Sequence, residues 1–195
     1  MNSVTVYCGS STQLDASFHE AADTVGKGLG EKGLTLVYGG GCIGLMGEVA
    51  ESAAASGANV VGVITHKLVG HEQANEACDE LIVVDTMQER RTLMMDRGDA
   101  YLVLPGGIGT YEELFEVLVG RQLNDHSKPI GIVNIDGYFD PLVEMLNHGI
   151  EHKFIRPAVH KLMFIDPCPR NVLHHITTTS VTQPPPEDIL PMHGN

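Results

Sequence analysis

A glycine-rich segment, PGGIGT at residues 105–110, has the residue types of an anion-binding loop. Gly106, Gly107 and Gly109 carry no Cβ, so their backbone amides can approach an anion closely. Thr110 is expected to open a helix, whose free N–H groups and dipole favour a phosphate at the first turn. The segment lacks the G-K-[ST] ending of a triphosphate-binding loop. It therefore predicts a site for a single phosphate.

Glu113 comes three residues after Thr110, and this spacing allows two interpretations. In the first, Thr110 is the N-cap, Glu113 occupies N3, and the two side chains form a capping box. In the second, Glu113 is a catalytic carboxylate one step from the phosphate site. Because a carboxylate repels phosphate, the second role requires Glu113 to face another part of the ligand, such as a sugar. The local sequence leaves both interpretations open.

Two adjacent arginines, Arg90 and Arg91, lie in a segment with helical spacing. Both border an apolar stripe formed by Met87, Met94 and Met95. An arginine near a buried face needs a carboxylate or phosphate partner. The alternative is a pair of surface arginines whose stems lie along the protein. In an acidic chain, and at a strand-to-helix junction, the functional interpretation is favoured.

Two further glycine loops follow predicted strands, at residues 8–11 and 39–47. Gly39, Gly41 and Gly44 satisfy G-x-G-x-x-G, which alone is a weak signal. The motif follows the second strand and lacks the acidic residue that a dinucleotide site places about 20 residues further on. NAD binding is therefore not expected. The substrate contacts predicted from these two loops are Gly9, Ser10, Gly40 and Gly41.

These loops must be positioned by a sheet. Short, continuously apolar runs alternate with amphipathic stretches along the chain, which is typical of parallel strands covered by helices on both faces. The strands are expected at residues 4–7, 34–38, 59–64, 81–84, 100–104, 129–134 and 164–166, and the helices at 15–32, 43–56, 87–97, 110–123, 140–152 and 171–176. The order predicts one doubly wound, Rossmann-like α/β domain with a mostly parallel sheet over residues 1–182. Residues 183–195 are Pro-rich and are expected to form a mobile tail.

Composition excludes several classes of function. The chain has 195 residues, enough for one domain, and a formal net charge of −13, which disfavours binding to nucleic acid. No apolar run is long enough to cross a bilayer. The four cysteines form no C-x-x-C pair and are expected to be reduced thiols of a cytoplasmic protein. His148 and His152 have one-turn spacing but lie away from the glycine loops, so no metal site is expected.

Taken together, the motifs resemble the LOG (LONELY GUY) family. The marks are VYCGSS at residues 6–11, LVYGGG at 36–41 with GLMG at 44–47, MQERR at 87–91, and PGGIGTYEE at 105–113, which matches P-G-G-x-G-T-x-x-E. Members of this family are phosphoribohydrolases that cleave the N-glycosidic bond of AMP or of N6-substituted (cytokinin) AMP. The resemblance therefore implies an N-glycosidase that releases a free base and ribose 5-phosphate without a cofactor or metal.

The resemblance also implies site residues. Arg90 and Glu113 match the family's catalytic pair. Substrate contacts are implied for Gly106, Gly107, Ile108, Gly109, Thr110, Tyr111 and Glu112, and for Arg91 and Glu72. Residue 91 is commonly Lys in the family, and Arg here keeps the charge but changes the geometry. A homodimer with sites near its interface is implied as well.

Two other functions remain as alternatives. Family members were historically labelled lysine decarboxylases, but none of the six lysines lies in a strand-end glycine loop, where a pyridoxal Schiff base would be expected. A non-enzymatic nucleotide sensor or carrier on the same fold is the second alternative, because fold alone does not determine function. A catalytic acid beside the sugar would distinguish an enzyme from a carrier.

Overall fold

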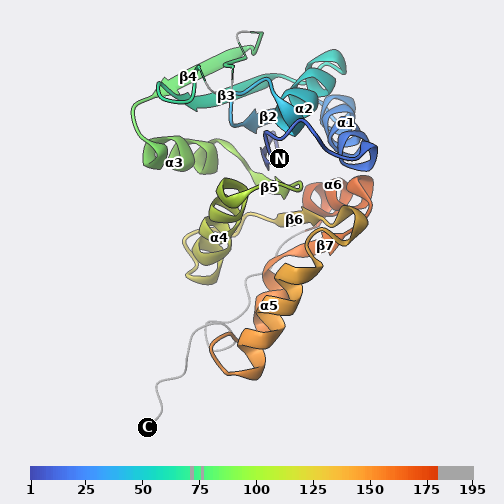
Figure 1. The fold of residues 1–195 in the computed structure, drawn as a ribbon, viewed down its shortest axis with the longest axis vertical. Coiled ribbons are helices and arrows are strands. Elements are labelled where there is room, and N and C mark those ends of the chain that lie inside the picture. The colour runs from blue at the N-terminus through green and yellow to red at the C-terminus, as the bar shows by residue number, and fades with distance from the viewer. Residues whose placement is uncertain (71–72, 76, 180–195) are drawn as a thin grey trace.

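A single seven-stranded parallel sheet forms the centre of the molecule (Figure 1). The computed structural model describes residues 1–70, 73–75 and 77–179. The strands are β1 (Ser3–Tyr7), β2 (Thr35–Tyr38), β3 (Val60–Thr65), β4 (Glu80–Val84), β5 (Ala100–Val103), β6 (Ile130–Val133) and β7 (Phe164–Asp166). The helices are α1 (Ala16–Glu31), α2 (Gly44–Ala55), α3 (Met87–Arg97), α4 (Ile108–Gln122), α5 (Asp140–Glu151) and α6 (Pro169–Thr178), with 3₁₀ turns η1 (Ile135–Gly137) and η2 (Pro157–Leu162).

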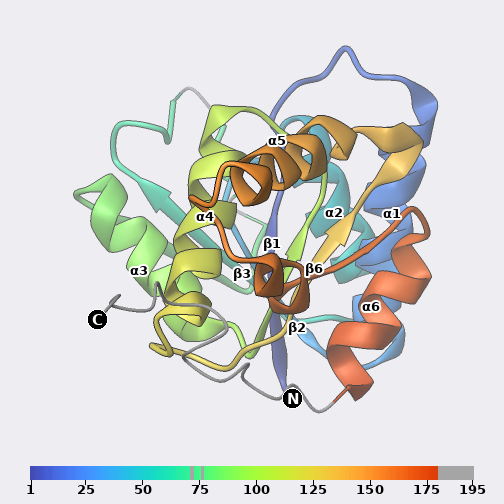
Figure 2. The ribbon, with the colours of Figure 1, turned by 90° about the horizontal axis from the view of Figure 1, so that it is seen from below.

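Alternating strand residues face two separate cores, which explains why the strands are apolar throughout. Val4 and Val6 of β1 pack with α1, α2 and α6, whereas Tyr7 packs on the opposite face with α3, α4 and α5. The two views of the ribbon show these two groups of helices on opposite sides of the sheet (Figures 1 and 2). The doubly wound, Rossmann-like fold predicted from the sequence is confirmed, and every strand pairing is parallel.

The strand order is β4-β3-β2-β1-β5-β6-β7. The chain starts in the middle of the sheet, builds outward from β1 to β4, and then crosses to the other side of β1 to build β5, β6 and β7. The direction of winding therefore reverses between β1 and β5. In open parallel sheets a crevice forms at this switch point, outside the carboxyl ends of the strands. The loops after β1 and β5 meet there.

Most predicted elements are found within a few residues of their expected positions, but α4 begins earlier than expected. Its first residue is Ile108 and its N-cap is Gly107, whose side chain offers no capping group. The expectation that Thr110 opens this helix is wrong. A capping box is present instead at the start of α3, where Thr86 accepts from the N–H of Glu89 and Glu89 accepts from the N–H of Thr86.

The expected boundary at residue 182 and the Pro-rich tail at residues 183–195 lie outside the described residues. Within the described part, no helix combines the length and apolar character needed to cross a bilayer.

Candidate active site

A cavity of about 200 Å³ lies at the switch point of the sheet. It opens between the carboxyl ends of β1, β2 and β5 and is flanked by α3 and α4. Its lining combines backbone of the glycine loops with a few apolar walls and two charged side chains. The lining residues are Val6, Tyr7, Cys8, Gly9, Ser10, Gly39, Met46, Arg90, Met94, Gly107, Gly109, Thr110 and Glu113.

The three glycine loops contact one another backbone to backbone. The N–H of Gly9 donates to the carbonyl of Pro105 at 3.0 Å. A Cβ on Gly106 would lie 2.8 Å from the Gly9 nitrogen, and a Cβ on Gly44 would lie 2.4 Å from the Ser11 carbonyl oxygen. Such distances are too short for any side chain, so these glycines are required for the approach of the loops. Gly44 therefore acts in packing.

The first turn of α4 offers backbone N–H groups suited to an anion. The N–H groups of Ile108, Gly109 and Thr110 have no partner within the helix, because they belong to its first three residues. They and the helix dipole favour an anion at the mouth of the loop. The hydroxyl of Tyr138 donates to the Gly106 carbonyl at 2.6 Å, which fixes the loop from the outside.

Glu113 lies in the second turn of α4 and is only 9% exposed. Because the helix starts at Ile108, Glu113 is the sixth helical residue and not N3. The capping-box interpretation of Glu113 is therefore wrong. Its carboxylate lines the cavity one turn beyond the anion-binding groups, where it can face a part of a ligand other than its phosphate.

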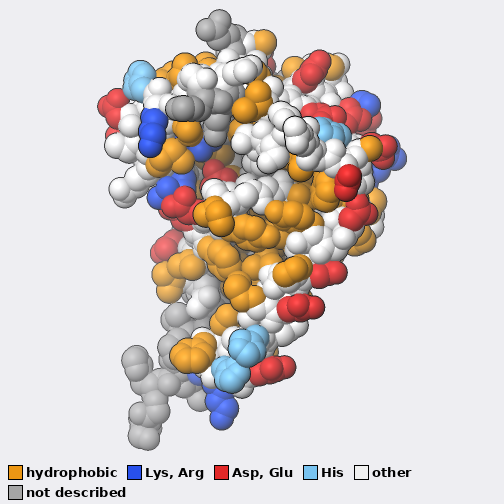
Figure 3. Space-filling view, in the orientation of Figure 1, with side chains coloured by type: hydrophobic (Ala, Val, Ile, Leu, Met, Phe, Trp, Pro, Cys, Tyr) orange, Lys and Arg blue, Asp and Glu red, His pale blue; other side chains and the backbone are white. Residues whose placement is uncertain are grey.

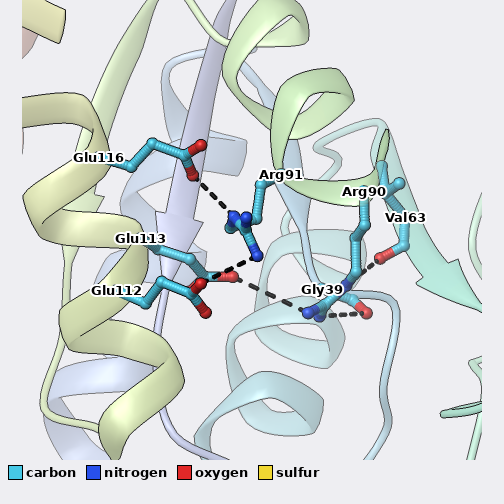
Figure 4. A network of polar contacts seen from close by, with 7 residues as sticks. All are labelled: Gly39, Val63, Arg90, Arg91, Glu112, Glu113 and Glu116. Carbon is cyan, nitrogen blue, oxygen red and sulfur yellow. Dashed lines mark hydrogen bonds and ion pairs between the residues drawn. The ribbon is translucent and has the colours of Figure 1, made fainter. Parts of the chain in front are cut away.

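Arg90 enters the same cavity from α3 and is 5% exposed. Its Nε donates to the Val63 carbonyl at 2.9 Å, and its Nη2 donates to the Gly39 carbonyl at 3.0 Å. Its Nη1 lies 3.9 Å from Oε1 of Glu113 (Figure 4). Burial of a full charge is costly unless the charge is paired and hydrogen-bonded. These contacts satisfy the guanidinium and direct it toward the carboxylate.

Tyr7 is a cavity residue that the sequence analysis did not identify. It is the last residue of β1, and its ring stacks on Tyr101 with centroids 6.1 Å apart. Burial, and secondarily the negative charge of Glu113, raise the pKa of Tyr7 well above the usual value of a phenol. Tyr7 therefore keeps its proton at neutral pH. Its place as the last strand residue before the first glycine loop is the signal that could have revealed it.

Arg91 and Glu112, for which substrate contacts were expected, do not line the cavity. Nη1 of Arg91 pairs with Oε1 of Glu112 at 3.0 Å, and its Nε donates to Oε2 of Glu116 at 2.9 Å. Figure 4 shows Arg91 directed at α4 beside the Arg90–Glu113 pair. Both arginines thus have carboxylate partners, but only Arg90 reaches the cavity.

Four further residues for which substrate contacts were expected, Gly40, Gly41, Ile108 and Tyr111, are not part of the cavity lining. Gly40 has a φ of +77° and packs on β3, and Gly41 forms an isolated bridge with Ala74. Ile108 is 87% exposed. Tyr111 packs edge-on against Phe139. Glu72 lies outside the described residues.

The residues expected to bear on a metal or pyridoxal site lie as follows. No group of three or more His, Cys, Asp or Glu side chains among those residues could hold a metal ion. The rings of His148 and His152 lie 4.4 Å apart at the end of α5, remote from the cavity. All six lysines are described, and none belongs to the cavity lining.

Fold and cavity together define a Rossmann-like α/β protein with a glycine loop suited to an anion and a buried carboxylate–guanidinium pair at the switch point. A family model described as "Possible lysine decarboxylase" matches residues 46–176. A probable cytokinin riboside 5'-monophosphate phosphoribohydrolase of Oryza sativa subsp. japonica, LOGL9, is 44% identical over 162 residues, which are 83% of this chain and 71% of that protein. The chain belongs to this LOG family.

Other relatives agree with this assignment, and a solved structure shares the fold. The phosphoribohydrolase LOG of Oryza sativa subsp. japonica is 40% identical over 87% of this chain and 70% of its own length, and LOG2 of Arabidopsis thaliana is 37% identical over 84% and 77%. The molybdenum cofactor carrier protein of Chlamydomonas reinhardtii shares the fold with a TM-score of 0.68, at 18% identity over 90% of this chain and 96% of that chain. At that identity the likeness concerns the fold alone.

The close contact between Gly39 and Arg90 leads to a prediction about stability. A Cβ on Gly39 would lie 2.2 Å from Nη2 of Arg90. We expect Gly39→Ala to lower the free energy of unfolding by about 1–3 kcal/mol, because the guanidinium must leave its carbonyl partners. In an Arg90→Ala background the same substitution should cost at least about 1 kcal/mol less. Urea denaturation of the four proteins measures this coupling.

Gly28→Ala is the matched control, because a Cβ there would meet only the end of the flexible Leu173 side chain. Its effect should be the same in both backgrounds. An equal cost of Gly39→Ala with and without the Arg90 side chain would contradict the assigned contact.

Proposed function

We propose that the protein is a nucleoside 5'-monophosphate phosphoribohydrolase acting on AMP or N6-substituted (cytokinin) AMP. The observation that carries this proposal is the placement of Glu113 and Arg90, with 3.9 Å between Nη1 and Oε1, one helical turn beyond an anion-binding loop in a single cavity. The activity for which members of the family are named agrees with this reaction. The bond cleaved is the N-glycosidic bond, and the products are the free base and ribose 5-phosphate.

The chemistry assigns different roles to the charged groups. As the bond from C1′ to the base nitrogen breaks, its electron pair leaves with the base and C1′ gains oxocarbenium character. The Glu113 carboxylate stabilises this cation or activates the water that adds to C1′, as carboxylates do in glycoside hydrolysis. Arginine holds its proton too tightly to be a simple general acid. Arg90 therefore orients Glu113 and stabilises its negative charge.

The phosphate subsite would be formed by backbone. In this proposal Gly9, Ser10, Gly107, Gly109 and Thr110 surround the 5′-phosphate, and the first-turn N–H groups of α4 bind its oxygens. A phosphate held there anchors the sugar at a fixed distance from Glu113. Binding energy from this remote group then contributes to the reaction at C1′.

A non-enzymatic nucleotide carrier is the second candidate, because a fold does not by itself determine function. A carrier, however, has no use for a buried acid beside the sugar of its ligand. Release of adenine from AMP by the purified protein distinguishes the two. Binding of AMP without any base release would support the carrier.

We propose further that the protein is a cytoplasmic homodimer. Large hydrophobic side chains are exposed on α4 and α5, including Val119 and Met145, and Figure 3 shows hydrophobic side chains gathered across this face. The cavity of about 200 Å³ is also smaller than the roughly 300–1,000 Å³ of most ligand pockets, so a second chain could complete the base site. The free thiols of Cys42, Cys78 and Cys168 suit a reducing compartment.

Light scattering on the purified protein tests the dimer. We expect a mass twice that of one chain at micromolar concentration, because contiguous apolar surface of this kind marks an interaction site. A mass equal to a single chain would contradict the proposal.

The role of Glu113 predicts the effect of Glu113→Gln. The amide has the shape of the carboxylate but no charge, so we expect kcat for AMP to fall by about 10²–10⁴-fold. Affinity for AMP should change little, because the phosphate contacts come from backbone. Base release and calorimetric binding measure the two effects, with the exposed Glu144→Gln on α5 as the control. Normal turnover by Glu113→Gln would reduce Glu113 to a structural residue.

The anion-binding loop predicts a requirement for a 5′-monophosphate. Adenosine lacks the anchoring group and should lose kcat as well as affinity, by at least about 100-fold in kcat/KM relative to AMP. ATP should also be poor, because the loop has no lysine for additional phosphates. Base release from the three compounds at equal concentration is the measurement. Comparable rates on adenosine and AMP would contradict the phosphate subsite.

A further inference from the structure

Arg91 occupies an unusual position for a charged side chain that does not reach the cavity. Its side chain is only 18% exposed, and it lies between α3 and α4 (Figure 4). Glu112 and Glu116 are one turn apart on α4, so they present their carboxylates on the same face of that helix. The guanidinium of Arg91 contacts both, at 3.0 and 2.9 Å. Arg91 thus joins α3 to two successive turns of α4.

This contact runs beside the pair that carries the proposed chemistry. Arg91 is the chain neighbour of Arg90 on α3, and Glu112 is the chain neighbour of Glu113 on α4. Arg90 is anchored to the ends of β2 and β3, through Gly39 and Val63, whereas Glu113 belongs to the helix that follows β5. The separation of 3.9 Å between Arg90 and Glu113 therefore depends on how α3 sits against α4.

Charge provides a second reason for this contact. Glu112, Glu113 and Glu116 place three carboxylates within five residues of one helix, next to a loop suited to an anion. Unpaired, they would repel one another and an incoming phosphate. Arg91 compensates two of them, and Glu113 is the carboxylate that lines the cavity.

We propose that Arg91 is a positioning residue that clamps α3 to α4 through Glu112 and Glu116, and that it does not contact the substrate. By the clamp we mean these three side chains. The clamp holds the Arg90–Glu113 pair in its reactive geometry, so its loss reduces kcat and leaves phosphate binding intact. This inference rests on the proposed hydrolysis of AMP and differs from the substrate contact that family resemblance implies for residue 91.

A double-mutant cycle between Arg91→Gln and Glu116→Gln tests the clamp. We expect each single variant to lower kcat for AMP by about 10-fold with KM within about 2-fold, since a small misplacement of catalytic groups is enough for such a loss. The double variant should be no slower than the slower single variant, because both remove the same interaction. Arg91→Lys, which retains the charge, should recover most of kcat.

Arg97→Gln is the matched control. Arg97 is also on α3 and forms an ion pair of similar length, 3.0 and 3.1 Å, with Glu80 of β4, but this pair is exposed and away from the cavity. Its loss should leave kcat and KM unchanged. A loss of kcat in Arg97→Gln equal to that in Arg91→Gln would indicate a general effect on α3 and would overturn the clamp.

Two other results would also overturn it. A KM raised about 10-fold in Arg91→Gln with unchanged kcat would mean that Arg91 binds substrate. Fully multiplicative effects of Arg91→Gln and Glu116→Gln on kcat would mean that they act independently. If the unmodified protein releases no base, the proposed function fails; the same cycle measured on urea unfolding still decides whether Arg91 and Glu116 are coupled.

Discussion

The buried guanidinium of Arg90 is the constraint on which the rest of the site depends. A positive charge with 5% exposure is tolerated only with several partners in good geometry. Two of these are carbonyls of Val63 and Gly39, near the ends of neighbouring parallel strands. A Cβ on residue 39 would displace the guanidinium from its carbonyl partners, because it would lie 2.2 Å from Nη2. The capping box that starts α3 fixes the helix from which Arg90 extends. The contacts that satisfy the charge of Arg90 therefore connect α3 to β3 and to the glycine loop after β2.

The same arrangement explains how a carboxylate can work close to an anion-binding loop. The N–H groups of the first turn of α4 are directed at the loop, whereas Glu113 lies one turn further along the helix and contacts Arg90. Separation along the helix and the adjacent positive charge both reduce the repulsion between carboxylate and phosphate. The proposed site would thus attract an anionic substrate although the whole chain has a net charge of −13.

Local pattern was enough to predict the parallel sheet, the order of helices and strands, and the loops that bear the site. It did not predict the features that depend on contacts between residues far apart in the sequence. The start of α4 at Ile108 is set by the approach of Gly106 to Gly9, which no window of neighbouring residues contains. Arg90 and Arg91 look equivalent beside their apolar stripe, yet Met87 is exposed and only Arg90 turns inward. Of residues 39–41, Gly39 is the one that lines the cavity, where its carbonyl accepts a hydrogen bond from Arg90. The roles of individual substrate contacts remain predictions.

The backbone contacts between the glycine loops also have a consequence for protein engineering. Where Gly9 meets Gly106 and Gly44 meets the carbonyl of Ser11, the contacts are made by backbone atoms, so these glycines cannot be exchanged for larger residues. Variation is easier at Met46 and Met94, which also line the cavity and whose flexible thioethers adapt to neighbours of different shape. A library aimed at new bases would be most economical if it left all three loops untouched and randomised these two methionines.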